Sequence, residues 1–208
     1  THNRHRLRIS TIPSFAARWL LPRLGDFIAT CPDVDVEVQS SHRAADVKGG
    51  EVDIGIRFDT GPHPGLYSER LMRDWLFPVC SPEFAKKYAL CDASGIDGVP
   101  LMHSEREPWS SWFPAAGIVA DEPEHGILFN DSALMLQAAA AGQGLCLARQ
   151  SIVYDELQSG RLVRPFSTYV ESPFSYFFVC RREKLAAPPI AAFRTWIFRQ
   201  IKNIPLLD

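Results

Sequence analysis

Several hydroxyl, carboxylate and guanidinium side chains follow segments of the chain that have the pattern of a β-strand. Ser14, Ser41 and Arg57 each come after such a segment, and Asp131 and Ser132 follow another. The carboxyl ends of parallel strands meet at one edge of a sheet, where helices begin with free N–H groups and small ligands bind, anions in particular. Together these side chains predict recognition of a small polar or anionic ligand without bond-making chemistry. For each residue alone, the alternative is a plain helix-capping role.

The short motifs of catalysis and metal binding are absent from the sequence. There is no G-x-S-x-G, H-E-x-x-H, P-loop or EF-hand pattern. Residues 142–144, GQG, come between an expected helix and an expected strand, which is the reverse of a dinucleotide-binding loop. The adjacent residues 103–105 would point to opposite faces of a strand and predict no catalytic triad. We expect His63 in an exposed loop rather than on a metal, and Asp53 in a structural hydrogen bond, so the sequence predicts neither an enzyme nor a cofactor.

The overall composition excludes several classes of protein. The 208 residues suffice for one large or two small domains, and 46% of them are hydrophobic, as in ordinary globular proteins. The net charge of −2 argues against a surface that grips nucleic acid. No apolar run approaches the about 18 residues of a membrane span. The five cysteines form no CxxC pair and predict buried positions in a reducing, cytoplasmic compartment.

Periodicity predicts a first α/β unit in the β-α-β-α-β order of a parallel sheet over residues 7–57. Its expected elements are a strand at Leu7 and Ile9, a helix capped by Ser14 and ending near Thr30, a strand at 34–38, a short helix from Ser41 to Lys48, and a strand at 52–56. A turn-rich loop, 59–65, comes next. The basic start of the chain predicts a linker remnant over residues 1–6, and a start at Thr1 rather than Met suggests a fragment or a processed form.

A second α/β unit is predicted over about residues 78–175. Its expected elements are extended segments at 76–80, 101–103, 127–129 and 145–148, and helices that start at Pro82, Ala133 and Ser151. Trp109, Trp112 and Phe113 form an aromatic cluster near two prolines. The β-prone run 176–180 is expected to pass between the units, and a final helix begins at Pro188-Pro189.

Six segments of the sequence, in the same order and spacing, resemble the effector-binding (regulatory) domain of LysR-type transcriptional regulators over nearly the whole chain. The matching segments are FAARWLLPRLGDF, GGEVDIGIR, LFPVCSPEF, FNDSALMLQAAAAGQGLCLARQSIV, SGRLVRPF and AAFRTWIFRQ. The segments RWLLPRL and SPFSYFFVCR are similar to the branch that contains the glycine-cleavage and β-lactamase regulators.

The resemblance implies an α/β fold of the periplasmic-binding-protein-like type 2, with two Rossmann-like lobes joined by two crossover strands. It implies that lobe I comprises residues 7–77 plus 181–208, that lobe II comprises 78–180, and that the effector binds in the cleft between them. Carried over by position, the expected effector contacts are Ser14, Ser41, Asp46, Arg57, Asp131, Ser132 and Tyr176. Tyr176 would lie on the returning crossover strand, and Arg57 at the rim of the cleft.

The partners implied by the resemblance are a small-molecule effector and further copies of the chain. The family implies a homodimer of this domain, with the first helix in the contact, and a homotetramer of the full-length protein. Promoter DNA would bind only through an N-terminal winged helix-turn-helix that these residues lack. A periplasmic solute-binding protein of the same fold remains the alternative at this point. Arg57 and the helix N-terminus hint at a carboxylate effector.

Overall fold

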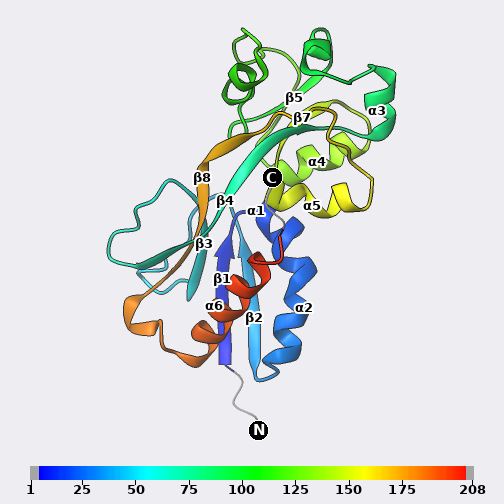
Figure 1. Ribbon diagram of the computed structural model, residues 1–208. Coiled ribbons are helices and arrows are strands. Elements are labelled where there is room, and N and C mark those ends of the chain that lie inside the picture. The colour runs from blue at the N-terminus through cyan, green and yellow to red at the C-terminus, as the bar shows by residue number, and fades with distance from the viewer. Residues whose placement is uncertain (1–4, 205–208) are drawn as a thin grey trace. The chain divides into compact units, whose positions relative to one another are not determined.

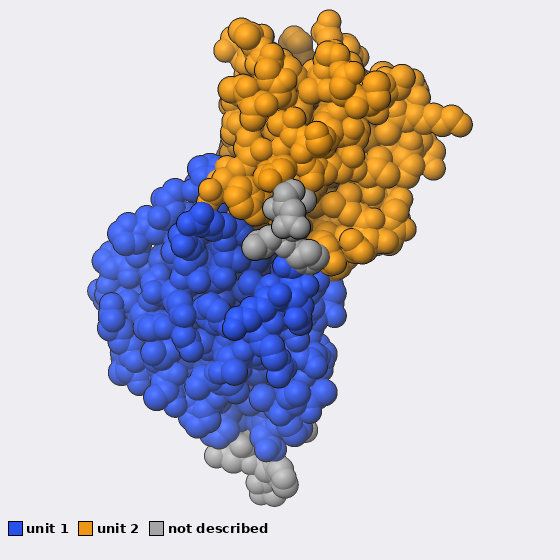
Figure 2. Space-filling view, viewed as in Figure 1, with its two compact units in different colours: residues 1–73, 173–208 blue, residues 74–172 orange. Residues whose placement is uncertain are grey.

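The computed structural model describes residues 5–204, which form two compact units. Unit 1 contains the described residues up to Arg73 and from Pro173 onward, and unit 2 contains residues 74–172 (Figure 2). The chain passes from unit 1 to unit 2 within strand β4 (Tyr67–Val79) and returns within strand β8 (Val170–Cys180). Each unit therefore has its own strands and helices, and the two crossover strands β4 and β8 connect the units along the chain (Figure 1).

In unit 1 the strand order is β2-β1-β3-β8, and β4 also begins in this unit. Strand β1 (His5–Thr11) pairs in parallel with β2 (Val34–Ser40) and with β3 (Ile54–Asp59), and β8 runs antiparallel to β3. The α-helices of unit 1 are α1 (Pro13–Phe15), α2 (Leu21–Thr30) and α6 (Pro188–Ile201). The predicted strands after residue 7, at 34–38 and within 52–56 are thus confirmed, with shifts of a few residues at their ends.

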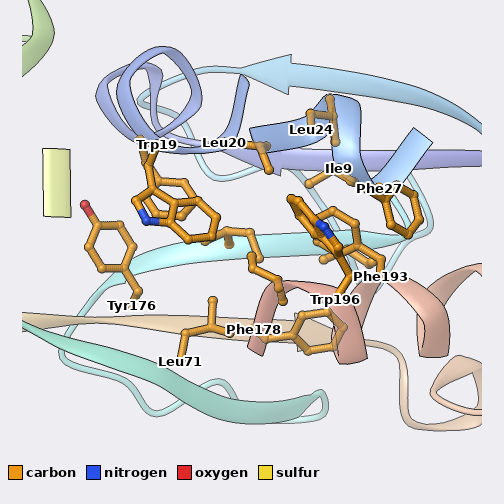
Figure 3. Close-up of a cluster of buried hydrophobic side chains, with 14 of the residues drawn as sticks. Ile9, Trp19, Leu20, Leu24, Phe27, Leu71, Tyr176, Phe178, Phe193 and Trp196 are labelled. Carbon is orange, nitrogen blue, oxygen red and sulfur yellow. The ribbon is translucent and has the colours of Figure 1, made fainter. Parts of the chain in front are cut away.

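One continuous helical segment leads from α1 through a π-helical turn, Ala16–Leu20, into α2. Pro22 lies at the start of α2 and has no N–H to donate a helical hydrogen bond. The chain forms a wider π-helical turn just before it, in which the Leu21 N–H donates to the Ala16 carbonyl. The apolar face of this segment packs with β1, β8 and α6 in one core (Figure 3). The Trp19 ring stacks on Phe15 at 4.9 Å and meets Trp196 edge-on at 6.5 Å. The predicted amphipathic helix is confirmed.

In unit 2 the strand order is β4-β7-β5-β6. Strand β7 (Leu145–Arg149) pairs antiparallel with β4, and β5 (Leu101–Ser104) pairs in parallel with β7 and with β6 (Ile127–Phe129). The helices of this unit are α3 (Pro82–Lys87), α4 (Ser132–Ala140) and α5 (Gln150–Gln158). These elements confirm the predicted segments of the second α/β unit.

The predicted aromatic cluster forms in unit 2, and the structure shows that it is buried. The Trp109 ring stacks on Phe113 at 5.6 Å and meets Trp112 edge-on at 5.9 Å. Each indole N–H has a backbone acceptor: Trp109 Nε1 donates to the Met102 carbonyl at 2.9 Å, and Trp112 Nε1 donates to the Thr168 carbonyl at 3.0 Å. Buried indoles keep their full apolar contribution only when this N–H is satisfied. The cluster thus anchors the irregular segment between β5 and β6.

Three local predictions are wrong. The short helix expected from Ser41 to Lys48 is absent, and turns occupy the segment before β3. Asp46 Oδ1 accepts the Gly49 N–H at 2.7 Å and Gly50 has a φ of +83°, so local side-chain bonds and a glycine turn replace helical bonds. Ser14 and Ser132 are not N-caps: Ile12 precedes α1 without a side-chain cap, and Asp131 caps α4.

The unit boundaries in the structure differ from those predicted at 77/78 and 180/181. Residues 175–180 pair with β3 of unit 1, and residues 76–79 pair with β7 of unit 2. Both crossover strands therefore change units nearer to β4 residue Arg73 and β8 residue Pro173. Of the predicted linker remnant, residues 1–4 lie outside the described residues, whereas His5 and Arg6 belong to β1 and pair with β2.

Candidate functional site

In unit 1, Ser14 and Tyr176 belong to one region at the end of the apolar core. Ser14 is buried at the start of α1, and its neighbour Phe15 places its ring 4.6 Å from the ring of Tyr176. Tyr176 also contacts Phe58 at 4.5 Å and lies at one end of the core cluster (Figure 3). Because β1, β3 and β8 are neighbouring strands, their residues bring the turn after β1 close to the Tyr176 ring.

Ser41 lies beside the same turn, just after the end of β2. Its backbone N–H donates to the Thr11 carbonyl at 3.1 Å, which continues the parallel pairing of β1 and β2. The Ser41 side chain is exposed, and its Oγ accepts the Arg43 N–H at 3.0 Å. Ser14 and Ser41 therefore sit at the carboxyl ends of adjacent parallel strands, as the sequence predicts.

Asp46 and Arg57 hold the segment before β3, and Arg57 lies on the other face of the sheet from Tyr176. Arg57 pairs with Phe177 across β8, whereas Phe58 pairs with Tyr176, and successive residues of a strand point to opposite faces. The Arg57 guanidinium donates to the Ala45 carbonyl at 2.5 Å. Burial lowers the pKa of Arg57, while the charges of Asp59 and Asp46 oppose that shift. The structure thus separates Arg57 from the Ser14 region and gives it a role in anchoring this segment.

In unit 2, Asp131 and Ser132 start helix α4 with their side chains buried. Asp131 Oδ1 accepts the N–H groups of Ala133 at 3.0 Å and of Leu134 at 3.3 Å, as an N-cap does. The Ser132 Oγ lies 2.9 Å from both carboxylate oxygens of Glu107, to which it donates. The two residues lie at the start of α4, as predicted, but Ser132 also faces a carboxylate that the sequence did not indicate.

A buried group of charged side chains lies behind Ser132. Arg149 Nε is 2.6 Å from Glu107 Oε1, and both side chains are 0% exposed. Asp74 is also buried and accepts from the Ser151 hydroxyl at 2.6 Å and from the Ser151 N–H at 3.1 Å. Burial raises the pKa of Asp74, and the Arg149 charge opposes that shift.

The sequence held one signal for this group. Arg149 directly continues the apolar run 145–148, so a cation at a strand end in the core could have been inferred. Glu107 carried no such signal, because it stands between Arg106 and Pro108 in what reads as an exposed polar turn. Its burial depends on its long-range contacts with α4 and β7.

Asp53 and His63, to which the sequence assigned no role in catalysis or metal binding, have structural partners. Asp53 accepts from the Arg8 backbone N–H at 2.9 Å and pairs with the Arg8 guanidinium at 3.2 Å, which confirms its structural role. His63 lies in a loop, but its side chain is only 11% exposed, so the expected exposure is wrong. Its ring nitrogens are held by Asp59 Oδ2 at 3.0 Å and Ser68 Oγ at 2.8 Å. Among residues 5–204, no group of three or more His, Cys, Asp or Glu side chains could hold a metal ion.

The cysteines follow the predicted pattern in part. Cys80, Cys146 and Cys180 are buried free thiols, and burial raises the pKa of Cys80 and of Cys180 to about 11. Cys91 is exposed and Cys31 is partly exposed, which the sequence did not indicate. Within the part of the chain that the structure describes, no helix is both long and apolar enough to cross a membrane.

Comparison with known proteins identifies relatives with the same fold. The chain is 36% identical to the glycine cleavage system transcriptional activator of Escherichia coli K12 over 92% of its own residues and 63% of that protein. It is 33% identical to the transcriptional activator AmpR of Pseudomonas aeruginosa, over 94% of this chain and 66% of that protein. The chain thus spans less than two thirds of the length of either regulator.

Solved structures agree with these relatives. The effector domain of AmpR from Pseudomonas aeruginosa superposes with a TM-score of 0.82 at 31% identity and covers 96% of each chain. The AmpR effector binding domain from Citrobacter freundii gives the same TM-score at 27% identity. These domains have the type 2 periplasmic-binding-protein-like fold, which this chain shares. The LysR substrate binding domain family matches residues 1–202, and the chain therefore belongs to that family.

Proposed function

We propose that this chain is the ligand-sensing domain of a LysR-type DNA-binding transcriptional regulator and that it binds a small polar effector. The observation that carries the proposal is the 31% identity and the TM-score of 0.82 with an effector domain over 96% of both chains. In this proposal a separate N-terminal domain of the full-length protein binds promoter DNA. The chain's own net charge of −2 agrees with that division of labour.

The proposed effector contacts come from both units. Unit 1 contributes Ser14, Ser41 and Tyr176, and unit 2 contributes Asp131 and Ser132. Asp46 and Arg57 take part through the segment that they anchor. This set is supported by the grouping of the first three residues at the ends of β1, β2 and β8, and of the last two at the start of α4.

The proposal extends to the absence of catalysis. The named relatives are transcriptional activators, and the carboxylate that accepts the Ser132 hydroxyl proton is already paired with Arg149. Steady turnover of any effector candidate by the purified chain would contradict this part. The relatives also remove the reason to retain a periplasmic solute-binding protein as the alternative.

A screen by thermal shift tests the binding function directly. A compound that binds only the folded state raises the melting temperature, and the stabilisation grows with the logarithm of one plus the ratio of its concentration to Kd. We expect a small polar metabolite to stabilise the wild-type chain, and Ser14→Ala to weaken that ligand about tenfold or more, as loss of a buried hydrogen bond does. Ser110→Ala is the matched control, because Ser110 is an exposed serine outside the proposed contacts. Equal affinity of wild type and Ser14→Ala would remove Ser14 from the site.

We also propose that the domain forms a homodimer and that the full-length protein forms a homotetramer. Two pairs of exposed apolar residues support the dimer. Leu21 and Ile28 lie seven residues apart on α2 in unit 1, and Leu128 and Leu134 lie on β6 and α4 in unit 2. An unpaired sheet edge with exposed apolar residues near it is a surface that another chain can cover. Strands β2 and β6 are the two ends of the strand series among the described residues.

A further inference from the structure

The hydroxyl proton of Ser132 is committed to a buried carboxylate. Ser132 Oγ lies 2.9 Å from each oxygen of Glu107, and Arg149 Nε lies 2.6 Å from Oε1 of the same carboxylate. An ionised carboxylate only accepts hydrogen bonds, whereas a hydroxyl has one proton to donate and lone pairs to accept with. The Ser132 proton must therefore point at Glu107, and only its lone pairs remain for a ligand.

The ion pair makes this orientation hard to reverse. Glu107 and Arg149 are both 0% exposed, and a buried charge that loses a partner is left without water to replace it. A ligand that took the Ser132 proton would deprive Glu107 of one of its donors. An approaching carboxylate would also bring a second negative charge towards Glu107. Both effects oppose an anion at Ser132.

Asp131 removes the usual attraction of a helix N-terminus for anions. Its Oδ1 already accepts two of the first N–H groups of α4, those of Ala133 and Leu134. The Asp131 charge also offsets the positive end of the helix dipole. The start of α4 therefore presents acceptors: the Ser132 lone pairs and a capping carboxylate, with Glu107 behind them.

We propose that the start of α4 recognises a hydrogen-bond donor of the effector, above all a protonated amine, and discriminates against a carboxylate there. Glu107 and Arg149 act as positioning residues that orient the Ser132 hydroxyl. The inference rests on the proposed function, since it takes Asp131 and Ser132 as effector contacts. It assigns the ligand a chemical class at this end, whereas the carboxylate hinted at by the sequence was argued from Arg57 and a helix N-terminus.

The test compares matched probes that differ only in the amine or the carboxylate. Small amino acids, their deamino acids and their amides are titrated into the purified chain at pH 7 by calorimetry and thermal shift. We expect amino acids and amides to include the binders, and each deamino acid to bind at least about tenfold more weakly than its parent, as loss of one charge-assisted hydrogen bond implies. Deamino acids that bind as well as their parents, or no binding by any amine-bearing probe, would overturn the inference.

Three variants locate the preference at α4. In Asp131→Asn the capping oxygen is retained and the charge is removed, so we expect the ratio of amino acid to deamino acid affinity to fall at least about threefold without loss of folding. Asp92→Asn is the matched control, because Asp92 caps a helical turn of the same unit by accepting the Ser94 N–H at 2.9 Å. Glu107→Gln places an amide that can donate to Ser132 Oγ, which frees the Ser132 proton for an anion and lowers the same ratio. If Glu107→Gln does not fold, Asp131→Asn and Ser132→Ala carry the test.

The outcomes separate this inference from the proposed function. Weaker binding in Ser14→Ala and Tyr176→Phe, with an unchanged ratio in the Asp131 and Ser132 variants, keeps the effector site and rejects the donor preference. Binding that none of the variants at Ser14, Tyr176, Asp131 and Ser132 alters rejects the site itself. A lower ratio in Asp131→Asn and not in Asp92→Asn supports the inference.

Discussion

The ion pair of Glu107 and Arg149 lies in the interior of unit 2. Both side chains are fully buried, and their 2.6 Å contact also fixes the Ser132 hydroxyl at the start of α4. Desolvating two charges costs much of what their attraction returns, so a pair of this kind is weak evidence of net stability. Its position next to Ser132, a proposed effector contact, agrees better with a role in orienting the Ser132 hydroxyl.

Removal of one partner is nevertheless expected to be severe. We expect Arg149→Met to lower the free energy of unfolding by about 3–5 kcal/mol, because it leaves Glu107 buried without its cation. Urea denaturation followed by tryptophan fluorescence measures the change. Arg6→Met is the control: Arg6 pairs with Glu37 at 3.7 Å in an exposed position and should cost less than about 1 kcal/mol. Equal losses of stability in the two variants would contradict the claim that Glu107 needs Arg149 as its buried partner.

Asp74 predicts a dependence of stability on pH. Burial raises the pKa of this carboxyl in the folded state, so the folded chain holds its proton to a higher pH than the unfolded chain does. Such a group stabilises the fold below the ordinary carboxyl pKa, and this contribution is lost as the pH rises through the folded-state pKa. We expect Asp74→Asn to gain stability relative to wild type as the pH rises from the ordinary carboxyl pKa through the folded-state pKa of Asp74. Denaturation midpoints at several pH values test this, and a constant difference would contradict it.

At the scale of the element, hydrophobic periodicity was sufficient to predict most strands and long helices. It was insufficient to predict which residues cap the helices. Leu7 and Ile9 alternate with polar residues and form β1, and the spacing of Trp19, Leu24 and Phe27 places the buried face of the first helix. The helix expected before Lys48 fails because Asp46 and Gly50 favour turns over helical bonds. Caps depend on backbone geometry at single residues, which is why Ser14 and Ser132 were misplaced by one or two positions.

The turn before β3 offers a test at this scale. Gly50 has a φ of +83°, where an L side chain is strained, so Gly50→Ala should lower the free energy of unfolding by about 1–2 kcal/mol. Gly95→Ala is the matched control, since no atom lies within 4 Å of the position of its added Cβ, and its effect should stay within about 0.5 kcal/mol. Urea denaturation measures both. A neutral Gly50→Ala would mean that the turn adopts another conformation in solution.

At the scale of the whole molecule, the sequence placed two α/β units joined by two crossings but not the residues that build their interiors. The order of strand and helix patterns is local information, and it was enough to indicate two units. The contact of Glu107 with Ser132 spans 25 residues, and that of Asp74 with Ser151 spans 77, so no local pattern reports them. For the same reason the sequence put Arg57 with Tyr176, although the two lie on opposite faces of one sheet.

The proposed dimer would bury apolar side chains that are exposed in the single chain, among them Leu128. Leu128 on β6 is 67% exposed, and an aspartate there would be desolvated on association and leave an unpaired charge in the interface. We expect Leu128→Asp to shift the chain from dimer to monomer in sedimentation equilibrium and to leave its melting temperature within a few degrees of wild type. Val119→Asp is the matched control, since Val119 is a fully exposed apolar residue that is not among the four residues proposed for the contact, and it should leave the dimer intact. A wild-type chain that sediments as a monomer at about 100 μM, or a dimer that tolerates Leu128→Asp, would exclude this surface as the contact. If Leu128→Asp dissociates the dimer and Val119→Asp does not, assembly involves the edge of unit 2 that also carries the start of α4.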